Sequence, residues 1–163
     1  MSEHIRQATE KDVSRLAEIL VFNNRLNFYP IFRCDEYSFG EMQVIPIANE
    51  FLNTPGLLAR TFVYDDGVVR GMMVLEGDEV KRLFVEPSFQ GRGIGAALME
   101  RILSDARAIG YERVVLDTLP FLKSAIALYR ARGFEDIPPY NVSPIANPIY
   151  LGLELRSNDP EPV

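Results

Sequence analysis

The chain of 163 residues is poor in the side chains that most often carry nucleophilic, redox or metal chemistry. It has one cysteine, one histidine and no tryptophan. The single cysteine, Cys34, cannot form an internal disulfide, which favours a reducing compartment. The only histidine, His4, lies near the N-terminus and gives Cys34 no evident base partner, so a nucleophilic cysteine is disfavoured. With so few His and Cys residues, no metal site of the usual kind is expected.

Long apolar runs and an excess of positive charge are also missing. No run approaches the ~20 apolar residues of a membrane span, and residues 1–4 show no signal-peptide pattern. We therefore expect a cytoplasmic protein with no membrane partner. Lys and Arg number 17 against 23 Asp and Glu, a net charge of −6. This balance disfavours a nucleic-acid partner, because such binding depends on cations that face phosphates.

The apolar patterns and turn residues predict an ordinary globular domain of alternating strands and helices. A near capping box, Thr9 with Asp12, predicts the first helix, and Gly110 and Gly133 are expected to end two later helices. Residues 22–56 carry repeated Asn, Pro and Gly interruptions and are interpreted as loops around one or two short helices. The predicted strands are residues 5–8, 57–64, 68–76, 79–85, 113–118, 134–137 and 149–155, and the later helices are residues 94–109 and 122–132.

This order of elements predicts an α/β fold in one domain over residues 1–156. The sheet is expected to be mixed and mostly antiparallel, with helices on both faces. Residues 157–163 are polar and are expected to form a disordered tail.

The most informative stretch is a glycine-rich loop between the strand over 79–85 and the helix that begins at Ile94. Glycines at 91, 93 and 95 free the backbone to turn its N–H groups toward one point. The first turn of the helix adds unpaired N–H donors and the positive end of the helix dipole. The loop therefore predicts a cradle for a phosphate or pyrophosphate.

Two common phosphate loops fit this stretch poorly. A nucleotide-hydrolase P-loop needs a Lys and a Ser or Thr after its last glycine, and neither follows here. Gly91, Gly93 and Ala96 formally match the dinucleotide fingerprint. That fingerprint begins at the strand end, whereas residues 86–90 intervene here, and too few residues follow for a two-half dinucleotide domain. A nucleotide-binding oxidoreductase that prefers NAD remains a rival interpretation.

A third pattern fits better and carries a family resemblance. Gln90, Gly93 and Gly95 match the Gln/Arg-x-x-Gly-x-Gly/Ala pattern of an acetyl-CoA loop. Downstream, Ala125, Leu128 and Tyr129 followed by Gly133-Phe134 match the Ala-x-x-Leu-Tyr-x-x-x-Gly-Phe segment of the same family. The chain thus resembles the GCN5-related N-acetyltransferases over roughly residues 79–137, and the first 56 residues match only in outline.

The resemblance implies a coenzyme site built mostly from backbone. The N–H groups of Gly91, Arg92, Gly93, Ile94, Gly95 and Ala96, together with Gln90, are expected to hold the pyrophosphate of acetyl-CoA. The backbone of Leu83, Phe84 and Val85 is expected to pair with the pantetheine arm as another strand would. The Arg92 side chain either adds a positive charge or points to solvent.

Acetyl transfer to an amine also needs an acid and a base. Tyr129 occupies the family's tyrosine position and is expected to protonate the leaving thiolate, whereas the helix pattern alone would make it a core tyrosine. Glu79 is the first candidate base, Asp117 is the second, and a water chain without a base is the third alternative. Many relatives carry an asparagine where this chain has Leu122, so that coenzyme contact is in doubt.

The sequence predicts an acetyl-CoA-dependent N-acetyltransferase that uses direct transfer in a ternary complex, with acetyl-CoA as co-substrate and no metal. A non-catalytic acyl-CoA sensor of the same fold is the alternative. The acceptor is expected to be a small amine or an amino-terminal group, near residues 27–30, 35–37 and 138–141. A homodimer is left open.

Overall fold

The computed structural model describes residues 1–142 and 147–155. Its strands form one seven-stranded sheet in the order β1-β2-β3-β4-β5-β7-β6. β4 and β5 run parallel, and the pairs β1–β2, β2–β3, β5–β7 and β6–β7 are antiparallel. The predicted α/β class and the mixed, mostly antiparallel sheet are confirmed. The predicted tail over 157–163 lies outside the described residues.

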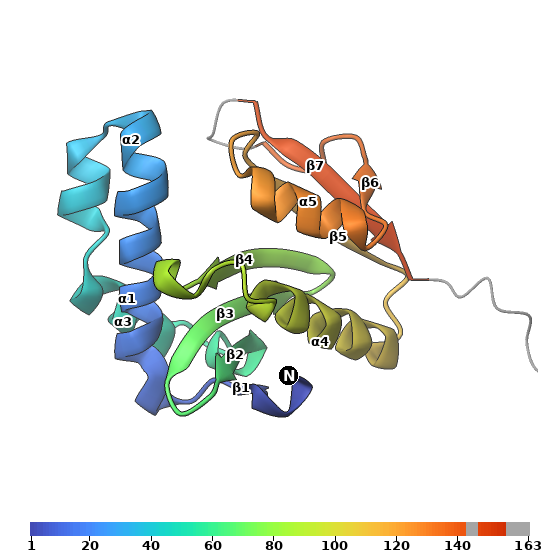
Figure 1. The fold of residues 1–163 in the computed structure, drawn as a ribbon, viewed down its shortest axis with the longest axis horizontal. Helices are drawn as coiled ribbons and strands as arrows, with labels where there is room; N and C mark the ends of the chain where they lie inside the picture. Colours follow the sequence, from blue (N-terminus) through green and yellow to red (C-terminus); the bar gives the residue numbers. More distant parts are fainter. Residues whose placement is uncertain (143–146, 156–163) are drawn as a thin grey trace, which may run out of the picture. The chain divides into compact units, whose positions relative to one another are not determined.

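The elements are labelled in Figure 1. The strands are β1 (Ile5–Gln7), β2 (Thr61–Asp65), β3 (Val69–Glu76), β4 (Glu79–Val85), β5 (Arg113–Thr118), β6 (Glu135–Asp136) and β7 (Ile149–Glu154), and the α-helices are α1 (Val13–Asn23), α2 (Tyr29–Phe32), α3 (Val44–Asn53), α4 (Ile94–Ile109) and α5 (Lys123–Ala131). Most bounds agree with the prediction within one or two residues. The predicted strand over 57–64 begins later, at Thr61, because Leu58–Arg60 form a 3₁₀ turn. In the described part of the chain, no helix combines the length and apolarity that a membrane crossing requires.

The chain divides into two compact units. The first comprises Met1–Leu75 and Arg82–Arg101; the second comprises Glu76–Lys81 and the residues from Ile102 onward. β4 and α4 each begin in one unit and end in the other.

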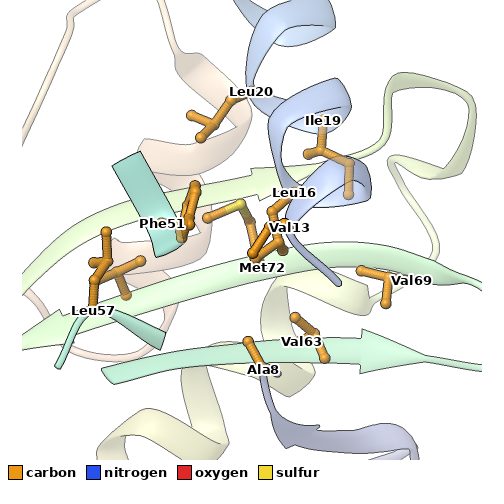
Figure 2. Packing of buried hydrophobic residues seen from close by; sticks show 11 residues of the cluster. Ala8, Val13, Leu16, Ile19, Leu20, Phe51, Leu57, Val63, Val69 and Met72 are labelled. Atoms are coloured by element: carbon orange, nitrogen blue, oxygen red, sulfur yellow. The ribbon is translucent and has the colours of Figure 1, made fainter. Parts of the chain in front are cut away.

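In the first unit, helices pack on both faces of β3. Met72 and Val74 lie in the cluster that joins β3 to α1 and α3 (Figure 2). Residue 71 faces the other way, because side chains alternate along a strand. There a Cβ on Gly71 would lie 3.0 Å from Cγ2 of Ile94 and 3.3 Å from Cδ1 of Leu98. Only glycine lets the start of α4 approach β3 this closely.

The prediction for residues 22–56 was wrong in its proportion of helix. Two π-helical turns, Asn24–Phe28 and Glu36–Glu41, together with α2 and α3, make most of this stretch helical. Pro30 is tolerated because it lies in the first turn of α2, where its missing N–H has no intrahelical acceptor. The asparagine pair at 23–24 does not end the helical path: α1 ends at Asn23, and the π-helical turn Asn24–Phe28 follows it directly.

The second unit is built on a register in which β7 lies beside β5. Val115 lies opposite Gly152, and Gly152 lies opposite Glu135 of β6. A Cβ on Gly152 would come 3.0 Å from Cγ2 of Ile137, so the chain after β6 packs closely over β7. α5 ends as predicted at Gly133, whose φ of +92° is costly for other residues.

Candidate functional site

Two of the three loop glycines have the backbone conformation that favours glycine, whereas Gly95 lies in the first turn of α4. Gly91 and Gly93 have φ values of +78° and +85°, in the region that favours glycine. The N–H of Ala97 donates to the Gly93 carbonyl over 3.0 Å, which makes Gly93 the residue that caps α4. The N–H groups of residues 94–96 precede this bond and have no acceptor within the helix.

The loop is open to a ligand. Residues 90–93 are exposed. A Cβ on Gly91 would meet no atom within 4 Å, and one on Gly93 would meet only the end of the Met1 side chain, at 3.6 Å, among the described residues. The N–H donors without a helical acceptor and the positive end of the α4 dipole suit an anion of the size of a phosphate. The backbone of the loop therefore fits a pyrophosphate.

The side chain of Gln90 ties the loop to the end of β4. Its Nε2 donates to the Val85 carbonyl over 3.2 Å and to Oδ1 of Asn23 over 3.3 Å. Leu83, Phe84 and Val85 are partly buried at the end of β4, beyond the Glu79–Val115 pair that joins β4 to β5. The first unit thus brings the predicted loop and the predicted pantetheine-pairing residues together.

Two arginines stack on one aromatic ring beside the loop. The guanidinium carbon of Arg92 lies 4.5 Å from the centroid of Phe89, and that of Arg70 lies 3.9 Å from the same centroid. Arg70 also pairs with Asp66 through a 3.0 Å contact. Arg92 is thus held against Phe89 next to the N–H donors, which favours the first of its two sequence interpretations, an added positive charge.

In the second unit, Glu79 and Asp117 lie on one face of the sheet. Glu79 lies opposite Val115, and Asp117 is two residues further along β5. Nζ of Lys81 lies 3.0 Å from Oε1 of Glu79, and this carboxylate raises the pKa of Lys81. The Glu79 side chain is 13% exposed, whereas that of Lys81 is 48% exposed. Glu79 is therefore a mostly buried carboxylate with a cation beside it.

Two tyrosines and an asparagine continue this face. Tyr150, opposite Asp117 in the register, donates its hydroxyl to Oδ1 of Asn141 over 2.8 Å. Nδ2 of Asn141 lies 3.4 Å from Oδ2 of Asp117, and the ring of Tyr140 meets that of Tyr150 edge-on at 5.2 Å. Burial, followed by the charges of Glu79 and Asp117, raises the pKa of Tyr140. The face therefore keeps the Tyr140 hydroxyl protonated.

Tyr129 lies on the buried side of α5. It is 6% exposed, and its ring centroid is 5.8 Å from that of Phe134. Burial raises the pKa of Tyr129 to about 12. The phenol therefore keeps its proton at neutral pH, as a general acid must before it acts. Glu79 and Tyr129 belong to the second unit, and the loop belongs to the first.

The comparison with protein families decides between the phosphate-binding interpretations. The model of the acetyltransferase (GNAT) family matches residues 20–134, more than half of the chain. The chain belongs to the GNAT family. The matched range includes the glycine loop, Glu79 and Tyr129, and it leaves out the last two strands.

GNAT proteins of known sequence share part of the chain. It is 43% identical over 79 residues to an uncharacterised N-acetyltransferase of Dictyostelium discoideum, covering 48% of this chain and 37% of the other. It is 47% identical over 62 residues to an IAA acetyltransferase of Azospirillum brasilense, covering 38% and 40%. The matches thus span less than half of each relative.

Solved GNAT structures share the fold over almost the whole chain. PaiA N-acetyltransferase of Thermoplasma acidophilum, solved with coenzyme A, has a TM-score of 0.72 at 15% identity and covers 92% of this chain and 97% of its own. YncA of Salmonella typhimurium, described as a putative acetyltransferase and solved with acetyl-CoA, has a TM-score of 0.68 at 20% identity and covers 96% and 95%. At these identities the likeness shows the fold alone.

Other residues named from the sequence have simpler surroundings. Cys34 is an exposed free thiol. Leu122 precedes the first turn of α5 and is partly buried. In the acceptor segments, the Tyr29 hydroxyl donates to Oδ1 of Asp35 over 2.6 Å. Within residues 1–142 and 147–155, no three His, Cys, Asp or Glu side chains gather as a metal-binding group.

Sequence reasoning missed two residues whose side chains contact the loop region, Arg70 and Asn23. Arg70 gave no signal, because its link to Phe89 depends on the pairing of β3 with β4, in which the Glu86 N–H donates to the Arg70 carbonyl over 2.7 Å. Asn23 was interpreted as one of the interruptions of residues 22–56. Its place in line with the apolar face of the first helix could instead have indicated a buried polar residue.

Proposed function

We propose that this protein transfers an acetyl group from acetyl-CoA to an amine, by direct transfer within a ternary complex. The observation that carries the proposal is the open loop of Gly91 and Gly93, with positive φ values, at the start of α4. The chain's membership of the GNAT family supports acetyl-CoA as the ligand, and the loop suits the pyrophosphate of that coenzyme. Bound acetyl-CoA would supply the acetyl group as a thioester.

The residues of the chain would then do three things. The N–H groups from Gly91 to Ala96 bind the pyrophosphate, and the end of β4 holds the pantetheine arm with its backbone. Tyr129 holds a proton on its buried hydroxyl and donates it to the leaving thiolate. Glu79, directly or through water, accepts the proton that the amine must lose.

Titration calorimetry with acetyl-CoA, coenzyme A and NAD, followed by an amine panel scored for thiol release, tests the proposal. We expect acetyl-CoA to bind, NAD not to bind, and at least one amine to release thiol. Preference for NAD would instead favour the oxidoreductase. Binding without turnover on any amine would contradict the enzyme and favour the acyl-CoA sensor.

A further inference from the structure

Asn23 is a buried side chain beside the glycine loop, and each hydrogen-bonding group of its amide has a partner. It is 3% exposed and lies at the end of α1, where the π-helical turn Asn24–Phe28 begins. Its Nδ2 donates to the carbonyls of Ile19, over 2.8 Å, and Val85, over 3.0 Å. Its Oδ1 accepts from Nε2 of Gln90, over 3.3 Å, and from Nδ2 of Asn27, over 3.2 Å.

These four bonds use the full capacity of the amide. A primary amide offers two N–H donors and an oxygen with two lone pairs. Because all four of these groups are paired inside the protein, the Asn23 side chain has one favourable orientation. Loss of the partners of its N–H groups or of its oxygen would leave a buried polar group unpaired. Asn23 therefore fixes the relative positions of its partners.

The partners come from two regions that are distant in sequence. Ile19 and Asn27 lie one turn before and after Asn23, whereas Val85 ends β4 and Gln90 opens the glycine loop. The turn that follows β4 contacts α1, and Figure 1 shows the two together. Gln90 and Asn23 also donate to the same Val85 carbonyl, so the three groups form a closed triangle.

We propose that Asn23 is a positioning residue for coenzyme binding. It holds Gln90 and the end of β4 in the geometry that the coenzyme requires, and through Asn27 it ties the helical segment that follows α1 to that geometry. This inference rests on the proposed function, because it assumes that the loop binds acetyl-CoA. A π-helical turn beside a binding site is a common functional arrangement.

Asn24 offers a matched control. It is the next residue of the same helix and is buried at 7%, but its Oδ1 has no hydrogen-bond partner among the described residues. The variants Asn23→Leu and Asn24→Leu thus make the same chemical change at neighbouring buried positions. Only the first removes the bonds to Gln90 and Val85.

The test is calorimetric titration of the full chain with acetyl-CoA, combined with steady-state kinetics. We expect Asn23→Leu to raise Kd and the KM for acetyl-CoA on the order of 10-fold with little change in kcat. Asn24→Leu should leave both near the wild-type values. Asn23→Asp, which keeps the side-chain shape, tests the same point if the leucine variant does not fold, and it too should raise Kd.

A double-mutant cycle separates positioning from general stability. Gln90→Ala should raise the Kd for acetyl-CoA by a similar factor. The double variant Asn23→Leu/Gln90→Ala should raise it by much less than the product of the two single factors, because both changes remove the same hydrogen bond. Two results would overturn this inference and leave the proposed function intact. The first is a Kd for acetyl-CoA that is the same in the wild type, Asn23→Leu and Asn23→Asp. The second is a double variant whose increase in Kd equals the product of the two single increases. Absence of acetyl-CoA binding by the wild type would instead overturn the proposed function and the inference with it.

Discussion

The Gln90–Ala96 loop and the Glu79–Asp117 face are two kinds of site in one chain. The loop offers backbone N–H groups whose direction is set by Gly91 and Gly93. The face offers side chains, and the neighbours Lys81 and Asn141 determine how available the two carboxylates are. A backbone site of this kind is specified by the local sequence. A side-chain site depends on residues that only the fold brings together.

The largest effect should come from placing a charge in the backbone site. Gly93→Asp adds a carboxylate where the loop would face pyrophosphate, and it forces a side chain onto a φ of +85°. Like-charge repulsion in a partly desolvated site should weaken acetyl-CoA binding by about 100-fold or more. Calorimetry measures this change.

Gly110→Asp is the control for backbone strain. Gly110 has a comparable φ of +98° with open space around a Cβ, and it lies at the opposite end of the 16-residue helix α4. The Gly110→Asp variant should bind acetyl-CoA with the Kd of the wild type. Equal loss in both variants would mean that strain, and not the phosphate cradle, explains the effect of Gly93→Asp.

The second effect tests the proposed acid in the second unit. Tyr129→Phe removes the hydroxyl and keeps the ring contact with Phe134. We expect kcat to fall roughly 100-fold, as for loss of a general acid, while the Kd for acetyl-CoA changes little. Stopped-flow or steady-state thiol release gives kcat; an unchanged value would remove Tyr129 from the mechanism.

A third, smaller effect distinguishes the two candidate bases on the side-chain face. Glu79→Gln should lower kcat by about 10-fold or more, because the group that accepts the proton is gone. Asp117→Asn is the matched change on the same face and should have the smaller effect. The reverse order would assign the base to Asp117, and no effect from either would favour a water chain.

A fourth change tests how firmly the loop is supported. Gly71→Ala places a Cβ 3.0 Å from Ile94 and 3.2 Å from the Phe84 carbonyl, so α4 or β4 must shift. Overpacking of this kind costs about 1–3 kcal/mol and should lower Tm by several degrees. Gly40→Ala, with nothing within 4 Å of the new Cβ, is the control and should leave Tm nearly unchanged. Equal Tm values for both would contradict close packing at Gly71.

The smallest effect is a pH dependence of stability. Burial raises the pKa of Tyr129 to about 12 from a usual value of 10, so the folded state holds this proton more tightly than the unfolded state does. The stabilisation is complete below pH 10 and is lost as the pH rises toward 12. In urea titrations, the free energy of unfolding should fall less steeply across this window in Tyr129→Phe than in the wild type. Identical slopes would show that Tyr129 is not buried as described.

The sequence specified the loop well and its surroundings poorly, for a physical reason. The turns at Gly91 and Gly93 and the helix end at Gly133 were predicted, because each needs a positive φ, which glycine adopts at little cost. The pairing of Lys81 with Glu79 and the stacking of Arg70 on Phe89 were not predicted. The first needs the rotamers of two strand residues, and the second needs a hairpin to bring distant residues together.

Residues 22–56 show the same limit in the fold. Asn23, Pro30 and Gly40 are local signals for helix interruption, yet each lies in a helical segment. Tertiary contacts override the signal: the amide of Asn23 is fully bonded inside the protein. The role of Tyr129 stays a prediction, because the family pattern supports the acid role and the burial of its ring equally suits a core tyrosine.

The most direct test of the central claim is amide chemical-shift mapping with isotope-labelled protein during titration with acetyl-CoA. We expect the amide signals of Gly91, Gly93, Ile94, Gly95 and Ala96 to shift most, and we expect coenzyme A, but not NAD, to reproduce these shifts. Saturable binding of acetyl-CoA with these amides unmoved would contradict the central claim.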